Sequence, residues 1–254
     1  MKLDALITPS EFAALSGRDL SRTACVVFDV LRATSTFVTA LHHGAEAVIP
    51  VCDIAEALTL RQQRPEVLLG GERHGVRISA GGVEFDLGNS PREYSGVRGR
   101  TIVSTTTNGT RALRACAAAP TVLAASFLNL TATAEFLLQN DSENILLVCA
   151  GTGENAALED VLGAGALCDL LAGASRAQDR VEPRSFHALS DAAQIAWRTY
   201  RESKADLPGA MSSSENARRL LAIPGLRDDV AFCLQQDLYP LVATMDKGGV
   251  IRTV

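Results

Sequence analysis

The sequence predicts a layered α/β fold, in which largely parallel strands lie buried between helices. Two observations support this prediction. Short apolar runs alternate with helical patterns through the first 175 of the 254 residues, and most of these runs lack the polar alternation of a half-exposed strand. Hydrophobic residues make up 47% and charged residues 21% of the chain, as in globular proteins. We expect a single unit over residues 1–254, with a helical insertion over about residues 183–236.

Each element follows from its own pattern and boundary signals. We expect strands at residues 24–28, 45–51, 66–70, 100–104, 121–125, 144–149 and 250–254. We expect helices at residues 34–43, 53–63, 110–118, 129–139, 155–171, 185–203, 212–222 and 226–236. Asp53 is the predicted N-cap of the second helix, and Pro208-Gly209 and Pro224-Gly225 separate the last three helices.

Composition excludes several classes of protein. The 24 basic and 29 acidic residues give a net charge of −5, and aromatic residues make up only 5%. A nucleic-acid partner is therefore not expected. No apolar run reaches the length of a membrane span, and the N-terminus does not look like a secretory signal. The six cysteines form no C-x-x-C pair, which favours reduced, buried thiols in a cytoplasmic protein. The sequence leaves a homo-oligomer open.

The first polar stretch follows the predicted strand 24–28 and begins with Asp29. An acid at the carboxyl end of a buried strand lies where α/β folds form ligand crevices. Thr34 and Ser35 open the next helix, where hydroxyls and free N–H groups can hold an oxyanion. The planar guanidinium group of Arg32 can donate two parallel hydrogen bonds to the same anion. An equally open alternative is a capping cluster with a surface ion pair between Arg32 and Asp29.

The second polar stretch, residues 104–110, again lies between a strand and a helix. Its hydroxyls, the amide of Asn108 and the turn at Gly109 form a candidate phosphate cradle that includes Thr106. The alternative is a threonine-rich strand that ends in an Asn-Gly turn with a threonine cap.

A third stretch contains Glu72 and Arg73, and a loop downstream contains Asn89 and Ser90. Glu72 is a candidate metal ligand or acid/base group, and Arg73 suits a sulfonate, carboxylate or phosphate. For both stretches a solvated turn is the simpler alternative.

A fourth stretch leads from a glycine-containing turn to Glu159 and Asp160 at the start of a helix. Such carboxylates suit Mg²⁺, although acids also complement the dipole of a helix N-terminus. The sequence lacks D-x-D-x-T, the C-x-x-x-x-x-R thiolate loop, G-x-S-x-G and a Walker A motif. A metal-assisted reaction on a small anion fits the remaining pattern.

These stretches together resemble the 2-phosphosulfolactate phosphatase (ComB-like) family. The matching segments, in the family's order, are FDVLRATST (28–36), GER (71–73), FDLGNSP (85–91), TTTNGT (105–110) and ED (159–160). The resemblance implies a Mg²⁺-dependent phosphatase that converts 2-phosphosulfolactate into sulfolactate and phosphate during coenzyme M biosynthesis. It also implies a three-layer α/β/α fold in which two α/β parts flank a cleft. The link over residues 75–85 is longer than is usual in this family.

We therefore predict a phosphatase site at the carboxyl ends of the strands. Asp29 and Glu72 are the predicted catalytic residues, and the predicted metal ligands are Asp29, Glu159 and Asp160. The residues expected to bind the phosphoryl group are Arg32, Thr34, Ser35, Thr106, Asn108 and Gly109. Those expected to bind the other anionic groups of the substrate are Arg73, Asn89 and Ser90. Two alternatives stay open: a phosphatase for another small phospho-2-hydroxy acid, and a non-enzymatic anion sensor.

Overall fold

The computed structural model describes residues 1–80, 82–177 and 188–254. Its strands are β1 (Lys2–Leu6), β2 (Thr23–Phe28), β3 (Ala47–Pro50), β4 (Leu68–Arg73), β5 (Val76–Arg77), β6 (Ser79–Ala80), β7 (Val83–Glu84), β8 (Thr101–Thr105), β9 (Thr121–Ala125), β10 (Asn144–Cys149), β11 (Ala188–Leu189), β12 (Ala243–Met245) and β13 (Ile251–Thr253). The α-helices are α1 (Ala33–His42), α2 (Ile54–Gln63), α3 (Gly109–Ala115), α4 (Leu130–Gln139), α5 (Leu158–Ala177), α6 (Asp191–Ser203), α7 (Leu207–Ser212), α8 (Glu215–Leu221) and α9 (Arg227–Cys233). Short 3₁₀ turns are η1 (Pro9–Gly17), η2 (Pro91–Gly96), η3 (Phe127–Asn129) and η4 (Pro224–Leu226).

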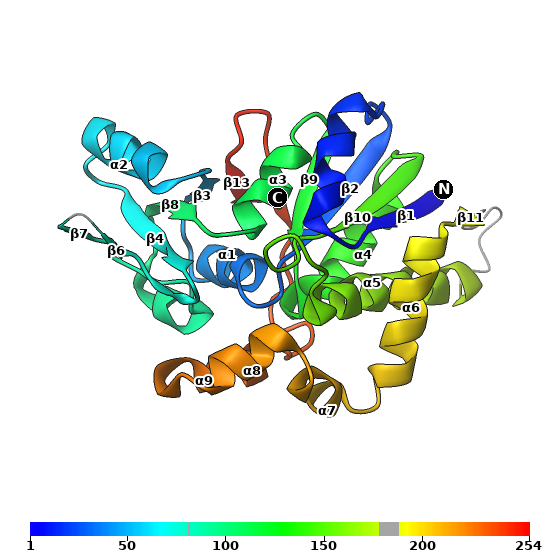
Figure 1. Ribbon diagram of the computed structural model, residues 1–254. Helices are drawn as coiled ribbons and strands as arrows, with labels where there is room; N and C mark the ends of the chain where they lie inside the picture. The colour runs from blue at the N-terminus through cyan, green and yellow to red at the C-terminus, as the bar shows by residue number, and fades with distance from the viewer. Residues whose placement is uncertain (81, 178–187) are drawn as a thin grey trace.

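The three-layer α/β/α fold is confirmed, with one mixed sheet between helices (Figure 1). The order of its strands is β11-β1-β10-β2-β9-β12-β13-β3-β8-β4-β5. The two groups β11-β1-β10-β2-β9 and β3-β8-β4 are each internally parallel. They form two halves of the sheet, which Figure 1 shows to either side of α1 and α3.

A β-hairpin at the end of the chain joins the two halves. β12 pairs with β9, β13 pairs with β12, and β13 meets β3 through Ile251 and Val48; all three pairings are antiparallel. The parallel strands of one half therefore run opposite to those of the other along the sheet. The sequence analysis expected a strand at residues 250–254 but no partner for it, because the three residues of β12 are too short to show a pattern.

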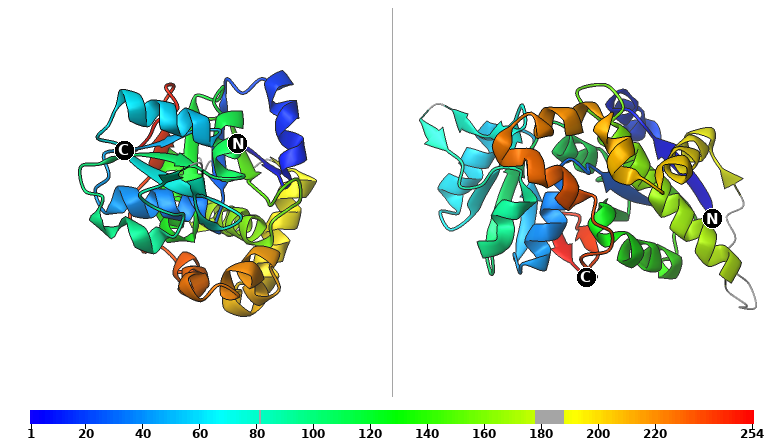
Figure 2. Two further views of the ribbon diagram at one scale, coloured as in Figure 1. Left: turned by 60° about the vertical axis from the view of Figure 1, so that its left-hand side comes forward. Right: turned by 90° about the horizontal axis from the view of Figure 1, so that it is seen from below.

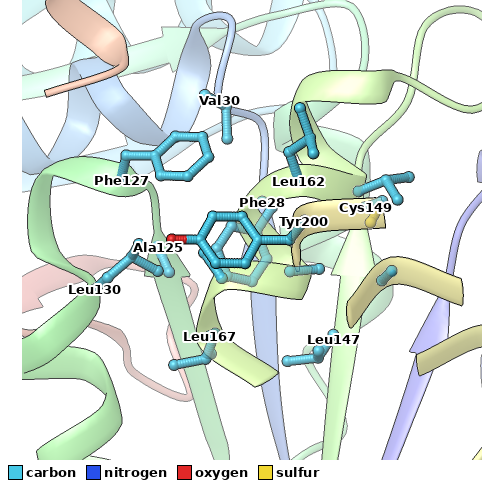
Figure 3. Packing of buried hydrophobic residues seen from close by; sticks show 14 of the residues in the cluster. Phe28, Val30, Ala125, Phe127, Leu130, Leu147, Cys149, Leu162, Leu167 and Tyr200 are labelled. Atoms are coloured by element: carbon cyan, nitrogen blue, oxygen red, sulfur yellow. The ribbon is translucent and has the colours of Figure 1, made fainter. Parts of the chain in front are cut away.

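The buried strands supply side chains to cores on both faces of the sheet. In β2, Ala24, Val26 and Phe28 face one core, whereas Cys25 and Val27 face the other. Figure 3 shows the first core, where Phe28 lies near Phe127, Leu162 and Leu167 beneath Tyr200 of α6. Because β2 is buried on both faces, its polar neighbours lie at its two ends, and Asp29 follows its carboxyl end.

The helices near the end of the chain cross the molecule between the two halves. In the view from below in Figure 2, α8 and α9 lie across this region. They are anchored by apolar side chains, since Ala217, Leu220, Val230 and Cys233 belong to the core beneath α5. This placement brings a segment with no recognisable motif next to the strand ends.

Several predicted boundaries were wrong for local reasons. β4 runs on through Arg73, so Glu72 and Arg73 belong to a strand rather than to a turn. The helix expected at residues 155–171 begins at Leu158, after a turn closed by hydrogen bonds between Thr152 and Asn155. The helix expected at residues 212–222 is interrupted, because the Ser214 side chain caps α8 at Ala217 N. The predicted start of the insertion, at residues 183–187, lies outside the described residues.

Two further expectations concern cysteines and membranes. All six cysteines are free thiols; five are buried as expected, but Cys52 is exposed. None of the helices in the described ranges is long and apolar enough to span a bilayer.

The close packing of α5 on α6 gives a stability prediction. A Cβ atom at Gly165 of α5 would lie 2.1 Å from the carbonyl oxygen of Ala196 in α6. Gly165→Ala should therefore destabilise the protein by about 1–3 kcal/mol, because the two helices must separate. Urea denaturation would measure this change in the free energy of unfolding.

Gly173, in the same helix, is the matched control. A Cβ atom there would meet nothing within 4 Å, so Gly173→Ala should stabilise the protein by about 0.5–1 kcal/mol through helix propensity. Equal effects of the two substitutions would contradict the packing described here.

Candidate active site

A cavity of about 310 Å³ lies where the carboxyl ends of strands from both halves meet. β2 and β10 contribute from one half, and β4 and β8 from the other, although the two halves run in opposite senses. The twist that accumulates from strand to strand turns one half relative to the other. The polar residues that line the cavity are Asp29, Arg32, Glu72, Arg73, His74, Asn89, Thr107, Asn108, Thr152, Asn216 and Arg219.

Asp29 is a nearly buried carboxylate between α1 and α3. Its Oδ1 accepts a hydrogen bond from the Ala33 backbone N–H at 2.9 Å, at the first turn of α1. Its Oδ2 lies 2.5 Å from the position that a Cβ atom would occupy at Gly109. Gly109 is therefore required for the close approach of Asp29 to α3, and it does not line the cavity itself.

The electrostatic surroundings of Asp29 disfavour its charge. Burial raises the pKa of Asp29 to about 7, against the lowering effect of the Ala33 N–H. The negative charges of Glu72 and Glu159 raise this pKa further, and the positive charge of Arg32 lowers it. A cation bound in the cavity would relieve the same repulsion.

Arg32 forms a buried ion pair that the sequence analysis did not anticipate. Its Nη1 donates to Asp229 Oδ2 of α9 at 2.7 Å, and both side chains are almost entirely buried. Its Nη2 donates to the carbonyl oxygen of Gly75 at 2.5 Å. Ser90 Oγ donates to the other oxygen of Asp229 at 2.7 Å. The partner of Arg32 is thus Asp229, not Asp29, and Ser90 serves this pair rather than lining the cavity.

Thr34 and Ser35 lie behind the cavity wall. Thr34 Oγ1 donates to the Asp29 carbonyl oxygen, and Ser35 Oγ donates to the Val30 carbonyl oxygen at 2.8 Å. Both side chains are fully buried. Their hydroxyls therefore hold the turn between β2 and α1, and the structure does not bring them to the cavity.

Glu72 holds the edge of the cavity formed by β4 and β8. Its Oε2 accepts from Gly75 N at 2.7 Å, and its Oε1 accepts from both Thr107 N and Thr107 Oγ1 at 2.9 Å. Arg73 Nη1 donates to the carbonyl oxygens of Glu72 and Thr105, and its Nη2 donates to Thr105 Oγ1 at 3.0 Å. Both side chains are thus held in place and both line the cavity.

The predicted phosphate cradle makes mostly internal contacts. Asn108 lines the cavity, and its Nδ2 donates to the carbonyl oxygens of Ala150 and Gly153, which holds the turn after β10. Thr106 Oγ1 accepts from Thr110 N at 3.2 Å and so caps α3. Of the three residues predicted in this stretch, Asn108 lines the cavity, whereas Thr106 and Gly109 do not.

Glu159 and Asp160 lie at the start of α5, beneath the cavity. Asp160 accepts from Val30 N and Gly151 N, at 2.8 and 2.9 Å, and so ties the ends of β2 and β10 together. Burial, with the charges of Asp29 and Glu159, raises the pKa of Asp160 well above its usual range. Glu159 accepts from Ser214 Oγ and Asn216 Nδ2, which ties α8 to α5. Neither carboxylate lines the cavity.

The donor set around the cavity fits Mg²⁺ held by few protein ligands. Within the described ranges, no three His, Cys, Asp or Glu side chains gather closely enough to hold a metal ion. Mg²⁺ is, however, commonly bound by one or two carboxylates together with waters and substrate phosphates. Asp29 and Asn89 line the same cavity, and the buried Oδ1 of Asn89 accepts no hydrogen bond from the residues described. An unsatisfied amide oxygen and a carboxylate that line one cavity are suitable hard ligands.

The sequence analysis missed three residues at this site: Asp229, Asn216 and Arg219. All three lie on α8 and α9, more than 50 residues beyond Asp160 in the chain. On the sequence they are ordinary polar positions of short helices, so no local signal marks them.

Comparison with known proteins identifies the family. The family model described as 2-phosphosulpholactate phosphatase matches residues 12–248. The chain belongs to this family. Three similar relatives, each named "Probable 2-phosphosulfolactate phosphatase", come from different bacteria. The protein of Thermotoga petrophila is 43% identical over 91% of this chain and 92% of its own length. The protein of Carboxydothermus hydrogenoformans is 37% identical over 95% of this chain and 92% of its own length. The protein of Clostridium acetobutylicum is 32% identical over 99% of this chain and 100% of its own length.

The family match makes this chain a phosphatase, and the matched region contains the whole cavity. The recognition that was based on five short segments is confirmed. The match also extends beyond those segments, through α8 and α9.

The raised pKa of Asp29 predicts a pH-dependent stability in metal-free protein. The folded state prefers the protonated form, so the contribution of Asp29 to stability is greatest below its unfolded pKa near 4 and is lost as the pH rises from there through about 7. Asp29→Asn removes the charge but keeps an oxygen for the Ala33 N–H. Its loss of stability between pH 5 and pH 8 should be smaller than that of the wild type by about 2–3 kcal/mol.

Urea denaturation at the two pH values in EDTA would measure this difference. Asp228→Asn is the control, because the Asp228 side chain is 75% exposed and should leave the pH dependence unchanged. The same pH dependence in Asp29→Asn and the wild type would refute the assignment.

Proposed function

We propose that this phosphatase hydrolyses 2-phosphosulfolactate to sulfolactate and phosphate, with Mg²⁺, as a step of coenzyme M biosynthesis in the cytoplasm. The printed names of the relatives support this substrate. The observation that carries the proposal is one cavity in which a nearly buried carboxylate, Asp29, lies among the guanidinium groups of Arg32 and Arg73. Six free thiols agree with a reducing compartment.

The charges of the cavity suit a small polyanion. The proposed substrate bears a phosphate, a sulfonate and a carboxylate. A net charge of −5 does not steer such a molecule towards the protein, so affinity must come from local cations. Because Arg32 is held by Asp229 and Gly75, its guanidinium is already oriented before the substrate binds.

Asp29 and the amide oxygen of Asn89 are the residues that would hold Mg²⁺. Both line the cavity, whereas Glu159 would act from behind it by adding negative charge, and Asp160 would hold the ends of β2 and β10 together. When bound, Mg²⁺ supplies positive charge against the phosphoryl oxygens as the bond from phosphorus to the substrate oxygen breaks.

We assign Glu72 as the residue that accepts a proton from the attacking water. A carboxylate has about four acceptor sites, and Glu72 uses three of them for Gly75 and Thr107. The remaining site, on Oε2, can accept the proton while the other three bonds keep the carboxylate in place. Hydrolysis adds the water oxygen to phosphorus and breaks the bond from phosphorus to the C2 oxygen. That oxygen leaves as the hydroxyl of sulfolactate by gaining one proton, which balances the proton that Glu72 takes from the water.

The proposal predicts metal-dependent turnover of a defined substrate. Purified enzyme with Mg²⁺ should release phosphate faster from 2-phosphosulfolactate than from 2-phospholactate or 2-phosphoglycerate. EDTA should abolish the release and added Mg²⁺ should restore it, while Asp29→Asn should lower kcat by about 100-fold or more.

The controls separate the alternatives. Full activity after removal of metal would refute the Mg²⁺ assignment. A preference for a phospho-2-hydroxy acid without a sulfonate would change the assigned substrate but not the assigned reaction. Tight binding of these compounds without turnover would indicate a sensor.

Arg73 is predicted to bind the sulfonate. Three of its five N–H donors are used by Glu72 and Thr105, and the other two, on Nε and Nη2, bond to no described residue. Two such donors form a fork that lysine cannot reproduce. Arg73→Lys should lower kcat/KM for 2-phosphosulfolactate by about 5- to 150-fold, the equivalent of about 1–3 kcal/mol.

The loss for 2-phospholactate should be much smaller, because that substrate lacks the sulfonate. Arg77→Lys, on the adjacent strand and outside the cavity lining, should affect neither substrate. Equal losses for both substrates in Arg73→Lys would place Arg73 at the phosphoryl group or the carboxylate.

A further inference from the structure

α8 brings a third guanidinium to the cavity, near the turn that follows β4. Arg219 and Asn216 of α8 both line the cavity. Arg219 Nη2 donates to Asn216 Oδ1 at 2.6 Å. Asn216 is itself buried and fixed, since its Nδ2 donates to Glu159 Oε1 and Thr152 Oγ1. A chain of hydrogen bonds thus holds the Arg219 head group against the cavity, although the side chain is otherwise exposed.

Arg219 forms no ion pair with any acid in the part of the chain that the structure describes. No carboxylate of the described residues lies within ion-pair distance of it, whereas Arg32 is paired with Asp229. Its hydrogen-bond partner, Asn216, is neutral. The bond to Asn216 uses one N–H of Arg219, so most of the five N–H donors of the guanidinium group can bind another acceptor.

Two guanidinium groups approach the same glycine. Arg32 Nη2 donates to the Gly75 carbonyl oxygen at 2.5 Å. Arg219 Nε lies 3.9 Å from the position of a Cβ atom at Gly75. Both groups carry a positive charge, so an anion bound near Gly75 would be attracted by both. Gly75 has φ +83° and no side chain, so α8 can lie close to the turn after β4.

We propose that Arg219, positioned by Asn216, binds an acid group of the substrate that is not transferred, the sulfonate or the carboxylate. This inference rests on the proposed function and deepens it. It makes α8 a specificity-determining element: Asp29 and Arg32 lie at the phosphoryl group, and Arg219 of the helix joins Arg73 in recognising the acid groups that remain on the product. The cavity would then select phosphorylated hydroxy acids with further negative groups over simple phosphate esters.

The product, sulfolactate, separates this role from phosphoryl binding, because it carries both remaining acid groups and no phosphate. Calorimetry should show that Arg219→Ala weakens sulfolactate binding by about 10- to 100-fold, as expected for one lost charge-assisted contact. Inhibition of turnover by inorganic phosphate should change less than about threefold. Arg219→Lys, which keeps the charge without the fork, should fall between Arg219→Ala and the wild type.

Arg218→Ala is the matched control, since Arg218 is the exposed neighbour on α8 and does not line the cavity. It should change neither sulfolactate binding nor phosphate inhibition. Unchanged sulfolactate affinity in Arg219→Ala would overturn the inference, as would an equal loss of phosphate affinity. A wild-type enzyme that neither turns over 2-phosphosulfolactate nor binds sulfolactate would overturn the proposed function as well, whereas an active wild type with an unaffected Arg219→Ala would overturn the inference alone.

Discussion

The structure around the cavity depends on how buried carboxylates are compensated. Burial of a charged group costs free energy unless hydrogen bonds or opposite charges replace its hydration. Asp160 is compensated by backbone N–H groups of Val30 and Gly151, and Glu72 by donors from Gly75 and Thr107. Each acid thereby joins the ends of two strands or turns. The same contacts that offset the free-energy cost of desolvating the acids also hold the cavity wall in shape.

The compensation is incomplete at Asp29, and this gives the site its electrostatic character. One backbone N–H and the nearby Arg32 act against burial and against two further acids, so the pKa stays near 7. A bound cation would supply the missing positive charge, and the phosphate of a substrate would then balance the cation and the guanidinium groups. In the proposed function, the metal and the polyanion would each supply the charge that the other requires.

The helices α8 and α9, near the end of the chain, complete this arrangement by holding the charged side chains in place. Asp229 of α9 orients Arg32, and Ser214 and Asn216 of α8 hold Glu159. A buried ion pair contributes little net stability, because desolvation offsets the attraction. Its value here is orientation: Arg32 presents its guanidinium in one position, which depends on the packing of α9 over η2 and the loop at Ser90.

The sequence was sufficient for features that depend on local pattern. The apolar runs at residues 121–125 and 144–149 match β9 and β10 to the residue, because strands buried on both faces contain few polar positions. The polar residues directly after β2 and β8, and those in the last two positions of β4, were also found, since a switch from apolar to polar marks a strand end. Of the predicted set, Asp29, Arg32, Glu72, Arg73, Asn89 and Asn108 line the cavity.

Only the tertiary structure decided how these ends meet and what stands behind them. The hairpin of β12 and β13 reverses one half of the sheet relative to the other, a consequence of pairings between residues more than 100 positions apart. Thr34, Ser35, Thr106, Glu159 and Asp160 have the residue types of ligand-binding groups, yet their hydrogen bonds go to neighbouring backbone and side chains. Whether a polar group faces the cavity or the protein depends on which distant element packs against it, and that information is absent from local sequence.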